Sequence, residues 1–385
     1  MRVALIDPSN FTLPYNLALC GGLTAGGHEV HAFGRSLGEG DSWPQESIPL
    51  HLNFYRGLER LSWLPRPLFL SLKGVSHSQS MLSLRSRLNA MRPDIIHFQW
   101  FPLPQIDRLL LPALRRLAPV VLTMHDTDPF NGNPSAAIQR WGASALARRC
   151  DRVIVHTRAG ALRLAEQGIK RERIAVLPHG LLGKHEATAQ PAAGPVTFLV
   201  FGKIKPYKGI DVFVEAIARM PAGLRDQCRF VVAGKPYMDL TAIKATVARH
   251  GLDHAIRFDL RYFSETEIAD LLAQASVMVF PYREIEASGV LAMALGTGRP
   301  IVASDIGGFS ETFTNGVTAA LVPPGDPDAL AAALSEMAAL PDERTRLGAA
   351  ALDLAASLKD WKSIADRTTD LYAAARADWG KSPTT

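Results

Sequence analysis

Residues 196–217 read VTFLVFGKIKPYKGIDVFVEAI. The apolar run at the start is typical of a buried strand and ends at Gly202, and the periodic apolar residues beyond the next glycine predict a helix. Three lysines, Lys203, Lys205 and Lys208, lie in the connecting loop. Many solvated loops are rich in lysine, but a loop that leads into a helix N-terminus also adds backbone N–H groups to those charges. We therefore interpret this stretch as a candidate phosphate-binding loop.

The same alternation of apolar strands and helices runs through both halves of the chain, which predicts an α/β protein with parallel sheets covered on both faces. The polar, Ala/Pro/Gly-rich residues 183–195 break the pattern and predict a linker between two doubly wound, Rossmann-like domains. In sheets of this kind ligands bind beyond the carboxyl ends of the strands, so two facing domains would form an interdomain cleft. The strands are predicted at 3–7, 29–33, 94–98, 120–125, 152–157, 174–178, 196–201, 229–233, 255–259, 277–280, 300–304 and 318–322, and the helices at 14–25, 79–91, 105–117, 135–149, 158–167, 210–219, 239–250, 265–274, 288–296, 326–338, 341–356 and 360–377.

The composition excludes several classes of protein. The chain has 385 residues, 47% of them hydrophobic, and a formal net charge of +5, which is too weak to argue for nucleic acid as a partner. Its three cysteines are scattered, which argues against a disulfide framework or a zinc site and favours a reducing, cytoplasmic compartment. No apolar run is long enough for a transmembrane helix, and neither a Walker loop nor a GxGxxG after a strand is present.

A second stretch, residues 280–308, reads FPYREIEASGVLAMALGTGRPIVASDIGG and has a related design. After a strand comes an acidic loop with Glu284 and Glu286, and then Ser288 and Gly289 open an apolar helix. Amide groups at a helix start suit a phosphate, and carboxylates beside them suit sugar hydroxyl groups. Taken alone, a capped helix behind a solvated acidic loop would explain the stretch equally well. The predicted helix-start amides are those of Gly289, Val290 and Leu291.

Both stretches, together with LTMHDTDP and IAVLPHG in the first half, resemble the retaining glycosyltransferases of family 4, the glycosyl transferases group 1, which have the GT-B fold. The resemblance covers essentially the whole chain. It implies an N-terminal acceptor-binding domain at 1–182, a nucleotide-sugar-binding domain at 196–360, and a C-terminal helix at 361–385 that packs back on the N-terminal domain. It also implies that Lys203 and Lys208 bind the donor diphosphate, with Gly202 beside them.

The family has two glutamates that contact the donor. The one for the donor sugar maps to Glu286, with Glu284 as the neighbouring alternative. The one for the ribose maps to Met293, which cannot accept a hydrogen bond from a ribose hydroxyl. Either another residue holds the ribose, or the nucleotide binds more weakly or differently. Contacts to the base are predicted from two loops after strands, at Gly234, Lys235, Arg261 and Tyr262.

In the first half the resemblance implies that His125, at the end of a strand, reaches the donor sugar. Taken alone, a histidine at a strand end is more often a structural hydrogen-bond partner. Residues 126–128 spell Asp-Thr-Asp, a pattern that holds Mn²⁺ in the other large glycosyltransferase fold. The two-domain layout is wrong for that fold and the resemblance implies metal independence, so we expect no metal ion or other cofactor, and treat Asp126 as a neighbour of the site.

The loop after the first strand differs from the glycine-rich loop that is commoner in the family. Its polar residues Asn10, Thr12, Tyr15 and Asn16 are predicted to line the acceptor side. A first turn with an N-cap explains them equally well.

Residues 54–74 and 108–117 combine leucines and aromatic residues with basic ones. Such segments can lie on anionic membranes. A loop that buries its apolar residues and leaves its arginines solvated is the alternative that we favour slightly. Many relatives use lipid-linked acceptors, so peripheral membrane contact at the inner face of the membrane is kept as a hypothesis. The basic residues concerned are Arg56, Arg60, Arg66 and Lys73.

The resemblance, together with these residues, implies a metal-independent, retaining hexosyltransferase that moves a sugar from a UDP- or GDP-linked donor to a glycan or lipid-linked acceptor in polysaccharide or glycoconjugate biosynthesis. Two alternatives are open from the sequence. One is a GT-B sugar-nucleotide epimerase, which needs no acceptor. The other is a non-catalytic nucleotide-sugar-binding subunit, which Met293 favours and Lys203, Lys208 and Glu286 oppose.

Overall fold

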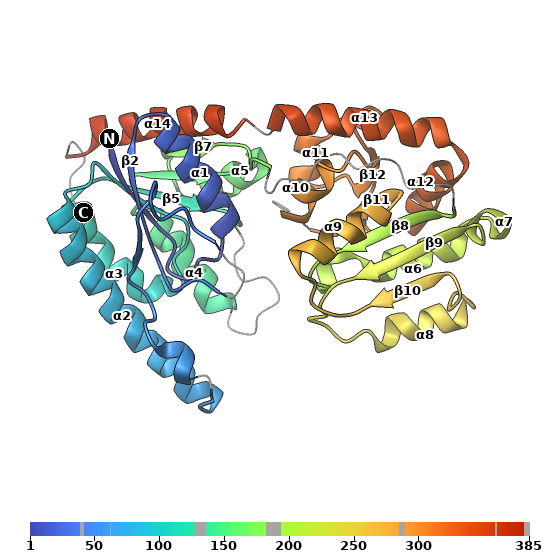
Figure 1. The fold of residues 1–385 in the computed structure, drawn as a ribbon, viewed down its shortest axis with the longest axis horizontal. Helices are drawn as coiled ribbons and strands as arrows, with labels where there is room; N and C mark the ends of the chain where they lie inside the picture. The colour runs from blue at the N-terminus through green and yellow to red at the C-terminus, as the bar shows by residue number, and fades with distance from the viewer. Residues whose placement is uncertain are drawn as a thin grey trace. The chain divides into compact units, whose positions relative to one another are not determined.

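The computed structural model describes residues 1–38, 42–61, 63–127, 136–181, 194–284, 289–358 and 360–380. The chain divides into two compact units. Unit 1 comprises Met1–Gly180 and Asp360–Thr385, and unit 2 comprises Leu181–Lys359. Most of the predicted linker lies outside the described residues. Each unit contains one parallel sheet with helices on its faces (Figure 1).

The sheet of unit 1 has seven strands in the order β3-β2-β1-β4-β5-β6-β7, and every pairing is parallel. The order reverses direction between β1 and β4, which is the switch point where ligands bind in such sheets. β4, β5 and β6 are buried along their whole length, as expected for central strands covered on both faces. The strands are β1 (Arg2–Ile6), β2 (Glu29–Gly34), β3 (Leu50–Leu52), β4 (Ile95–Phe98), β5 (Val120–Met124), β6 (Arg152–Val155) and β7 (Ile174–Val176), and the helices are α1 (Leu13–Ala25), η1 (Leu58–Leu61), α2 (Arg66–Met91), α3 (Pro104–Arg115), α4 (Ala136–Ala147), α5 (Arg158–Glu166) and η2 (Arg171–Arg173).

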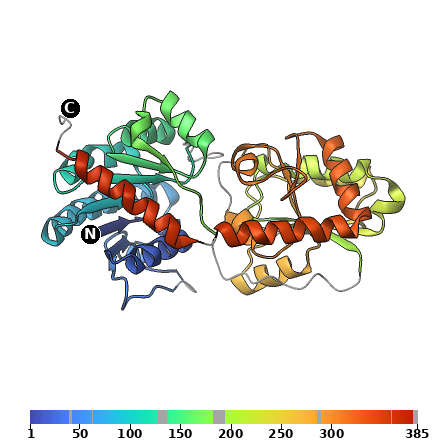
Figure 2. The same cartoon turned by 90° about the horizontal axis from the view of Figure 1, so that it is seen from above.

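The last helix of the chain, α14 (Trp361–Asp378), belongs to unit 1 and packs along α1 (Figure 2). A Cβ atom on Gly22 would lie 2.8 Å from the Cβ of Ala365, so a glycine is needed where the two helices cross. The Tyr372 hydroxyl lies 2.6 Å from Nδ1 of His97 on β4. Through these contacts α14 covers one face of the unit 1 sheet.

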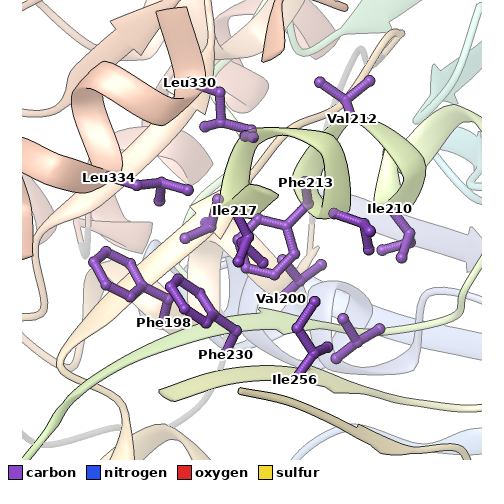
Figure 3. Packing of buried hydrophobic residues seen from close by; sticks show 14 of the residues in the cluster. Phe198, Val200, Ile210, Val212, Phe213, Ile217, Phe230, Ile256, Leu330 and Leu334 are labelled. Carbon is purple, nitrogen blue, oxygen red and sulfur yellow. The ribbon is translucent and has the colours of Figure 1, made fainter. Parts of the chain in front are cut away.

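The sheet of unit 2 has six parallel strands in the order β10-β9-β8-β11-β12-β13, with its switch point between β8 and β11. One of its core clusters lies between the sheet and α6, where Phe213 packs against Phe230 and Phe230 stacks on Phe198 (Figure 3). The strands are β8 (Val196–Phe201), β9 (Cys228–Ala233), β10 (Ile256–Asp259), β11 (Val277–Phe280), β12 (Ile301–Ser304) and β13 (Ala320–Val322), and the helices are η3 (Pro206–Lys208), α6 (Ile210–Arg219), α7 (Ala222–Arg225), α8 (Thr241–Arg249), α9 (Glu265–Gln274), α10 (Gly289–Leu295), α11 (Gly307–Thr312), α12 (Pro327–Ala339) and α13 (Pro341–Leu358).

The predicted α/β architecture is confirmed, and one expectation about local structure is wrong. The slightly favoured interpretation of residues 54–74 as a loop is wrong for residues 66–74, which together with residues 75–78 form the first half of α2. Pro65 is the N-cap residue and Pro67 lies in the first turn, where the missing N–H of proline would have no helical partner anyway. The two prolines therefore start this helix instead of preventing it. The short elements β3, α7 and α11 also have no counterpart in the sequence prediction.

A buried polar chain joins α2 to α3. Nε2 of His77 on α2 lies 2.7 Å from Oδ1 of Asp107 on α3, and the Tyr55 hydroxyl lies 2.9 Å from the other ring nitrogen. The Asp107 and His77 side chains are both fully buried. Burial raises the pKa of Asp107, while its hydrogen bond with His77 acts in the opposite direction. The hydrogen bonds from Tyr55 through His77 to Asp107 therefore give partners to polar groups that have no access to water.

Replacing His77 with alanine should reduce the free energy of unfolding by about 3–5 kcal/mol, because Asp107 would remain buried without its partner. Urea denaturation measures the change. His254→Ala is the matched control, because His254 is exposed and should change stability by less than about 0.5 kcal/mol. Equal stability of both variants would contradict a structural role for the hydrogen bonds between Tyr55, His77 and Asp107.

Candidate active site

The carboxyl ends of four adjacent strands in unit 2 carry most of the predicted donor-binding residues. In sheet order these strands are β10, β9, β8 and β11. Because all of them are parallel, the loops that follow them emerge at the same edge of the sheet. This edge therefore brings together four loops. In sheet order they contain Arg261 and Tyr262, then Gly234 and Lys235, then the three lysines, and last the acidic residues.

Close backbone contacts fix the shape of this edge at two glycines. Gly234 has φ +137°, and a Cβ atom there would lie 2.0 Å from the carbonyl oxygen of Gly202. Gly209 has φ +64°, and a Cβ atom there would lie 1.9 Å from the carbonyl oxygen of Pro281. No side chain fits at either position. The loops after β8, β9 and β11 are therefore packed backbone to backbone.

Lys208 lies at the switch point between β8 and β11. Its side chain is only 4% exposed, and its Nζ donates a hydrogen bond to the hydroxyl of Tyr282, just beyond the end of β11. A Cβ atom on Gly202 would lie 3.1 Å from this Nζ and 3.0 Å from Val290 on α10. Within the described ranges no carboxylate forms an ion pair with Lys208. The amino group of Lys208 therefore lies beside the end of β11, and no described carboxylate balances its charge.

Burial, together with the positive charge of Lys205, lowers the pKa of Lys208 to about 7. A buried ammonium without an anion is costly, because its hydration is lost and no opposite charge replaces it. A phosphate group beside Nζ would supply that charge. The site therefore has the electrostatics of an anion site whose lysine gains charge when the anion binds.

The neighbouring lysines have different surroundings. Lys203 is exposed, and Nζ of Lys205 lies 6.0 Å from the ring centroid of Tyr207. Arg283 holds the loop in place through two contacts with the Asp211 carboxylate, at 2.7 and 2.5 Å. Hydrogen bonds from Arg283 hold the pKa of Asp211 below its usual value. This ion pair links the acidic loop to the start of α6.

The acidic loop itself is only partly described. Glu286 and Ser288 lie outside the described residues, whereas Glu284 is exposed and precedes the gap. The helix begins at Gly289 and continues through Val290 and Leu291. Met293, at the position that the resemblance assigns to the ribose, is half-buried and packs against the core that includes Phe280 and Tyr282.

The predicted base-contacting residues lie at the outer end of the same edge. Arg261 forms ion pairs with Asp259 at 3.0 Å and with Glu267 at 2.6 Å, and its guanidinium lies over the ring of Phe263. Tyr262 is 80% exposed. An exposed ring can stack on a base, whereas the guanidinium of Arg261 already has two carboxylate partners. Lys235 lies nearer the lysine loop, and its backbone carbonyl accepts a hydrogen bond from Ile204.

In unit 1 the predicted His125 belongs to a cluster of three histidines, each just beyond the end of a strand. His125 follows β5, His156 follows β6, and His179 lies three residues beyond β7. One ring nitrogen from each lies within 4.8 Å of the other two. The ring of Tyr15 packs against all three, with centroid distances of 4.7, 5.4 and 5.2 Å. Burial lowers the pKa of every histidine in the cluster, to about 3 for His156, so all three are neutral at pH 7.

The other residues predicted for the acceptor side surround Asp7, the first residue after β1. Oδ2 of Asp7 accepts hydrogen bonds from Thr12 and from Nδ2 of Asn16, at 3.0 and 2.9 Å. Thr12 is the N-cap residue of α1 but makes no side-chain cap hydrogen bond, so the simple N-cap explanation does not hold. Nδ2 of Asn10 donates to the Arg35 carbonyl. The first turn is therefore organised around Asp7. Asp126, the remaining residue predicted for this side, is half-buried and lies after β5.

Sequence reasoning missed several residues at this edge. Nε2 of His125 lies 3.0 Å from Oε1 of Gln99, which follows β4, and Nδ1 of His125 lies 3.0 Å from Nε2 of His156. Phe11 is 63% exposed and stacks on Trp100 at a centroid distance of 5.5 Å, which gives this edge an aromatic surface. The available signal was positional, since DIIHFQW, RVIVHT and IAVLPHG each place a polar residue just past an apolar strand.

Comparison with known proteins gives the same assignment for both units. The family model for glycosyl transferases group 1 matches residues 195–339, and that for the glycosyl transferase 4-like domain matches residues 13–180. A D-inositol 3-phosphate glycosyltransferase of Streptomyces coelicolor is 30% identical over 320 residues, which cover 73% of this chain and 69% of that protein. A glycogen synthase of Mycobacterium tuberculosis is 29% identical over 301 residues, which cover 74% of this chain and 70% of the synthase.

Solved structures agree on the fold. The sucrose-phosphate synthase from Thermosynechococcus elongatus superimposes with a TM-score of 0.73 at 21% identity, covering 98% of this chain and 99% of that one. Anabaena HepE, solved in complex with UDP and glucose, superimposes with a TM-score of 0.71 at 17% identity, covering 97% and 100% of the two chains. The two parallel-sheet α/β units therefore have the GT-B fold of these structures. The chain belongs to the family of glycosyl transferases group 1, as its sequence motifs indicate.

The lowered pKa of Lys208 leads to a prediction about protons. Between about pH 7 and 10 the free protein holds Lys208 largely neutral, so binding of a diphosphate should take up a proton, approaching one per site at pH 8.5. Isothermal titration with UDP in buffers of different ionisation enthalpy measures this uptake. Lys208→Arg is the matched control, because a guanidinium stays charged and should abolish the uptake. Equal uptake by both proteins would show that Lys208 does not carry the proton.

Proposed function

We propose that this glycosyltransferase is retaining and transfers a sugar from a nucleoside-diphosphate sugar to a hydroxyl group of a glycan or lipid-linked acceptor. The single observation that carries the donor assignment is Lys208, a buried ammonium at the switch point of the unit 2 sheet. A diphosphate is the ligand whose charge suits this position. The UDP and glucose in the HepE structure support a UDP-linked donor as the first to be tested.

In this mechanism the bond between the anomeric carbon and the diphosphate breaks as the acceptor hydroxyl attacks from the same face. The acceptor proton passes to an oxygen of the departing diphosphate, so no enzyme base is needed, and attack from the same face retains the configuration without an enzyme nucleophile. Lys208 and Lys203 stabilise the charge that grows on the leaving group, as donors in an oxyanion hole do. His125 and Glu286 are the residues that we assign to orienting the sugar.

Lysines supply the positive charge that a metal ion supplies to the diphosphate in other glycosyltransferases, so we propose that transfer itself is independent of metal ions. On this proposal, activity persists in the presence of EDTA. The acceptor is assigned to the unit 1 edge, where the exposed ring of Phe11 offers an apolar surface beside the polar groups around Asp7.

The donor assignment predicts which ligands stabilise the protein. A nucleoside diphosphate at a hundred times its Kd should add about 2.7 kcal/mol to the free energy of unfolding, visible as a rise in Tm. UDP, GDP and ADP, alone and as sugar conjugates, are compared by thermal denaturation. In Lys208→Ala the rise should disappear, whereas Lys244→Ala, which removes an exposed lysine on α8, should keep it.

Two results would contradict the proposal. If none of the three nucleotides shifts Tm in the unchanged protein, the donor is not a nucleotide of these types. If a donor and acceptor are found and NMR shows that the product has the inverted anomeric configuration, the retaining mechanism is wrong.

We also propose that the N-terminal part of α2 contacts an anionic membrane surface. Figure 1 shows this end of the helix projecting from the body of unit 1. Trp63, Leu68 and Leu70 are 76%, 50% and 54% exposed, and Arg66 is exposed among them. Apolar side chains beside a cation suit the interface of a bilayer with anionic headgroups. No helix in the described part of the chain has the length and hydropathy to span a membrane.

Vesicle sedimentation tests the membrane contact. At low salt the protein should bind vesicles that contain an anionic phospholipid and bind neutral vesicles more weakly. Trp63→Ala combined with Leu68→Ser should reduce the bound fraction several-fold, and Arg66→Gln should reduce only the preference for anionic lipid. Leu162→Ser, an equally exposed leucine on α5, is the matched control. Unchanged binding in all variants would overturn the proposal.

A further inference from the structure

Three histidines lie together in unit 1, although orienting a sugar would require His125 alone. His125, His156 and His179 come from three adjacent strand ends, and one ring nitrogen of each lies within 4.8 Å of the others. A single orienting histidine needs one hydrogen-bond partner. Here two further histidines converge on the same point.

Each ring has its other nitrogen next to an oxygen acceptor. Nδ1 of His156 lies 3.0 Å from the Leu177 carbonyl, and Nδ1 of His179 lies 3.0 Å from the Gly180 carbonyl. A carbonyl oxygen only accepts hydrogen bonds, so these Nδ1 atoms carry the protons and the Nε2 atoms carry the lone pairs. Nε2 of His125 likewise faces Oε1 of Gln99 at 3.0 Å, which leaves the lone pair of His125 on Nδ1.

Two of these lone pairs face each other. Nδ1 of His125 and Nε2 of His156 are 3.0 Å apart, and with the protons placed as above neither nitrogen has a hydrogen to donate. A neutral network without a cation requires the Gln99 amide to turn by 180°, so that its NH₂ group faces His125 and the His125 proton moves to Nδ1. A cation between the rings satisfies the same nitrogens with Gln99 in its observed orientation.

We propose that His125, His156 and His179 form a three-histidine site for one transition-metal ion of the zinc class. Three imidazole ligands whose other nitrogens donate to carbonyl oxygens are the usual arrangement at such ions. Zn–N bonds of about 2.0–2.1 Å in a tetrahedron place the ligand nitrogens about 3.3 Å apart. The 3.0 Å separation of His125 and His156 is close to this value, and a small movement of His179 closes the third side.

The surroundings suit a bound ion. Each of the three histidines remains partly exposed, which leaves a route for the ion. Three protein ligands also leave a fourth position open for water or another oxygen ligand. Coordination by the three histidines and one oxygen ligand needs no carboxylate from the described residues.

A bound ion would also regulate sugar transfer. This consequence rests on the proposed function, whereas the metal site itself is independent of it. Coordination uses Nδ1 of His125 while Gln99 uses Nε2, so His125 has no nitrogen left for the donor sugar. Zinc should therefore inhibit transfer, and EDTA should relieve the inhibition.

Cobalt titration tests the site directly. Tag-free, EDTA-treated protein should bind one equivalent of Co²⁺ and show the visible absorption of a tetrahedral cobalt centre, which Zn²⁺ then abolishes by displacement. His156→Ala and His179→Gln should each weaken Co²⁺ binding by more than about 100-fold, since even residues that merely support a ligand contribute 10–100-fold. His250→Ala and His254→Ala, at surface histidines of unit 2, should bind as the unchanged protein does.

Circular dichroism of each variant checks that it folds, and His179→Gln provides a milder change should His156→Ala unfold. Failure of the unchanged protein to bind one equivalent of Co²⁺ or Zn²⁺ would overturn the proposal, as would undiminished binding in both folded variants. If cobalt binds as expected but zinc leaves transfer unaffected, the metal site stands and the assignment of His125 to the donor sugar is wrong.

Discussion

Every strand pairing in both sheets is parallel, and the position of each candidate site residue depends on this constraint. Parallel strands need crossover connections, and helices supply them on both faces of each sheet. All strand carboxyl ends of a unit then meet at one edge. Loops that are far apart in the sequence become neighbours there, as those of Lys208 and Tyr282 do at the switch point of unit 2.

The two edges have opposite electrostatic characters. In unit 2 the edge holds a buried ammonium whose pKa is lowered because burial removes its hydration. In unit 1 it holds three neutral histidines, each with one ring nitrogen within 4.8 Å of the other two. The first arrangement favours an anion, and the second favours a neutral hydrogen-bond partner or a cation. In our proposals the first arrangement binds the diphosphate of the donor, and the second binds a metal ion that regulates transfer.

Much of the fold was predictable from the sequence because buried parallel strands are short apolar runs bounded by glycine, proline or polar residues. VTFLVF before Gly202 is one example, and the structure confirms it as β8. The first half of α2 was not predictable in this way. Pro65 and Pro67 are helix breakers in the interior but are suited to the first turn, and only the path of the chain shows which applies. Contacts between distant residues, such as His77 with Asp107, were also beyond the sequence, since neither residue has a local signal for the other.

For the candidate site, the sequence by itself determined the chemistry available at each strand end: lysines and glycines after β8, and histidines after β5, β6 and β7. It also determined the family, through motifs whose spacing is local. Only the tertiary structure decided that Lys208 alone among the three lysines is buried, because this follows from the packing of the loops after β8, β9 and β11. Likewise it decided that three histidines spaced along 55 residues share one point, since the order of strands in a sheet is set by packing and not by local sequence.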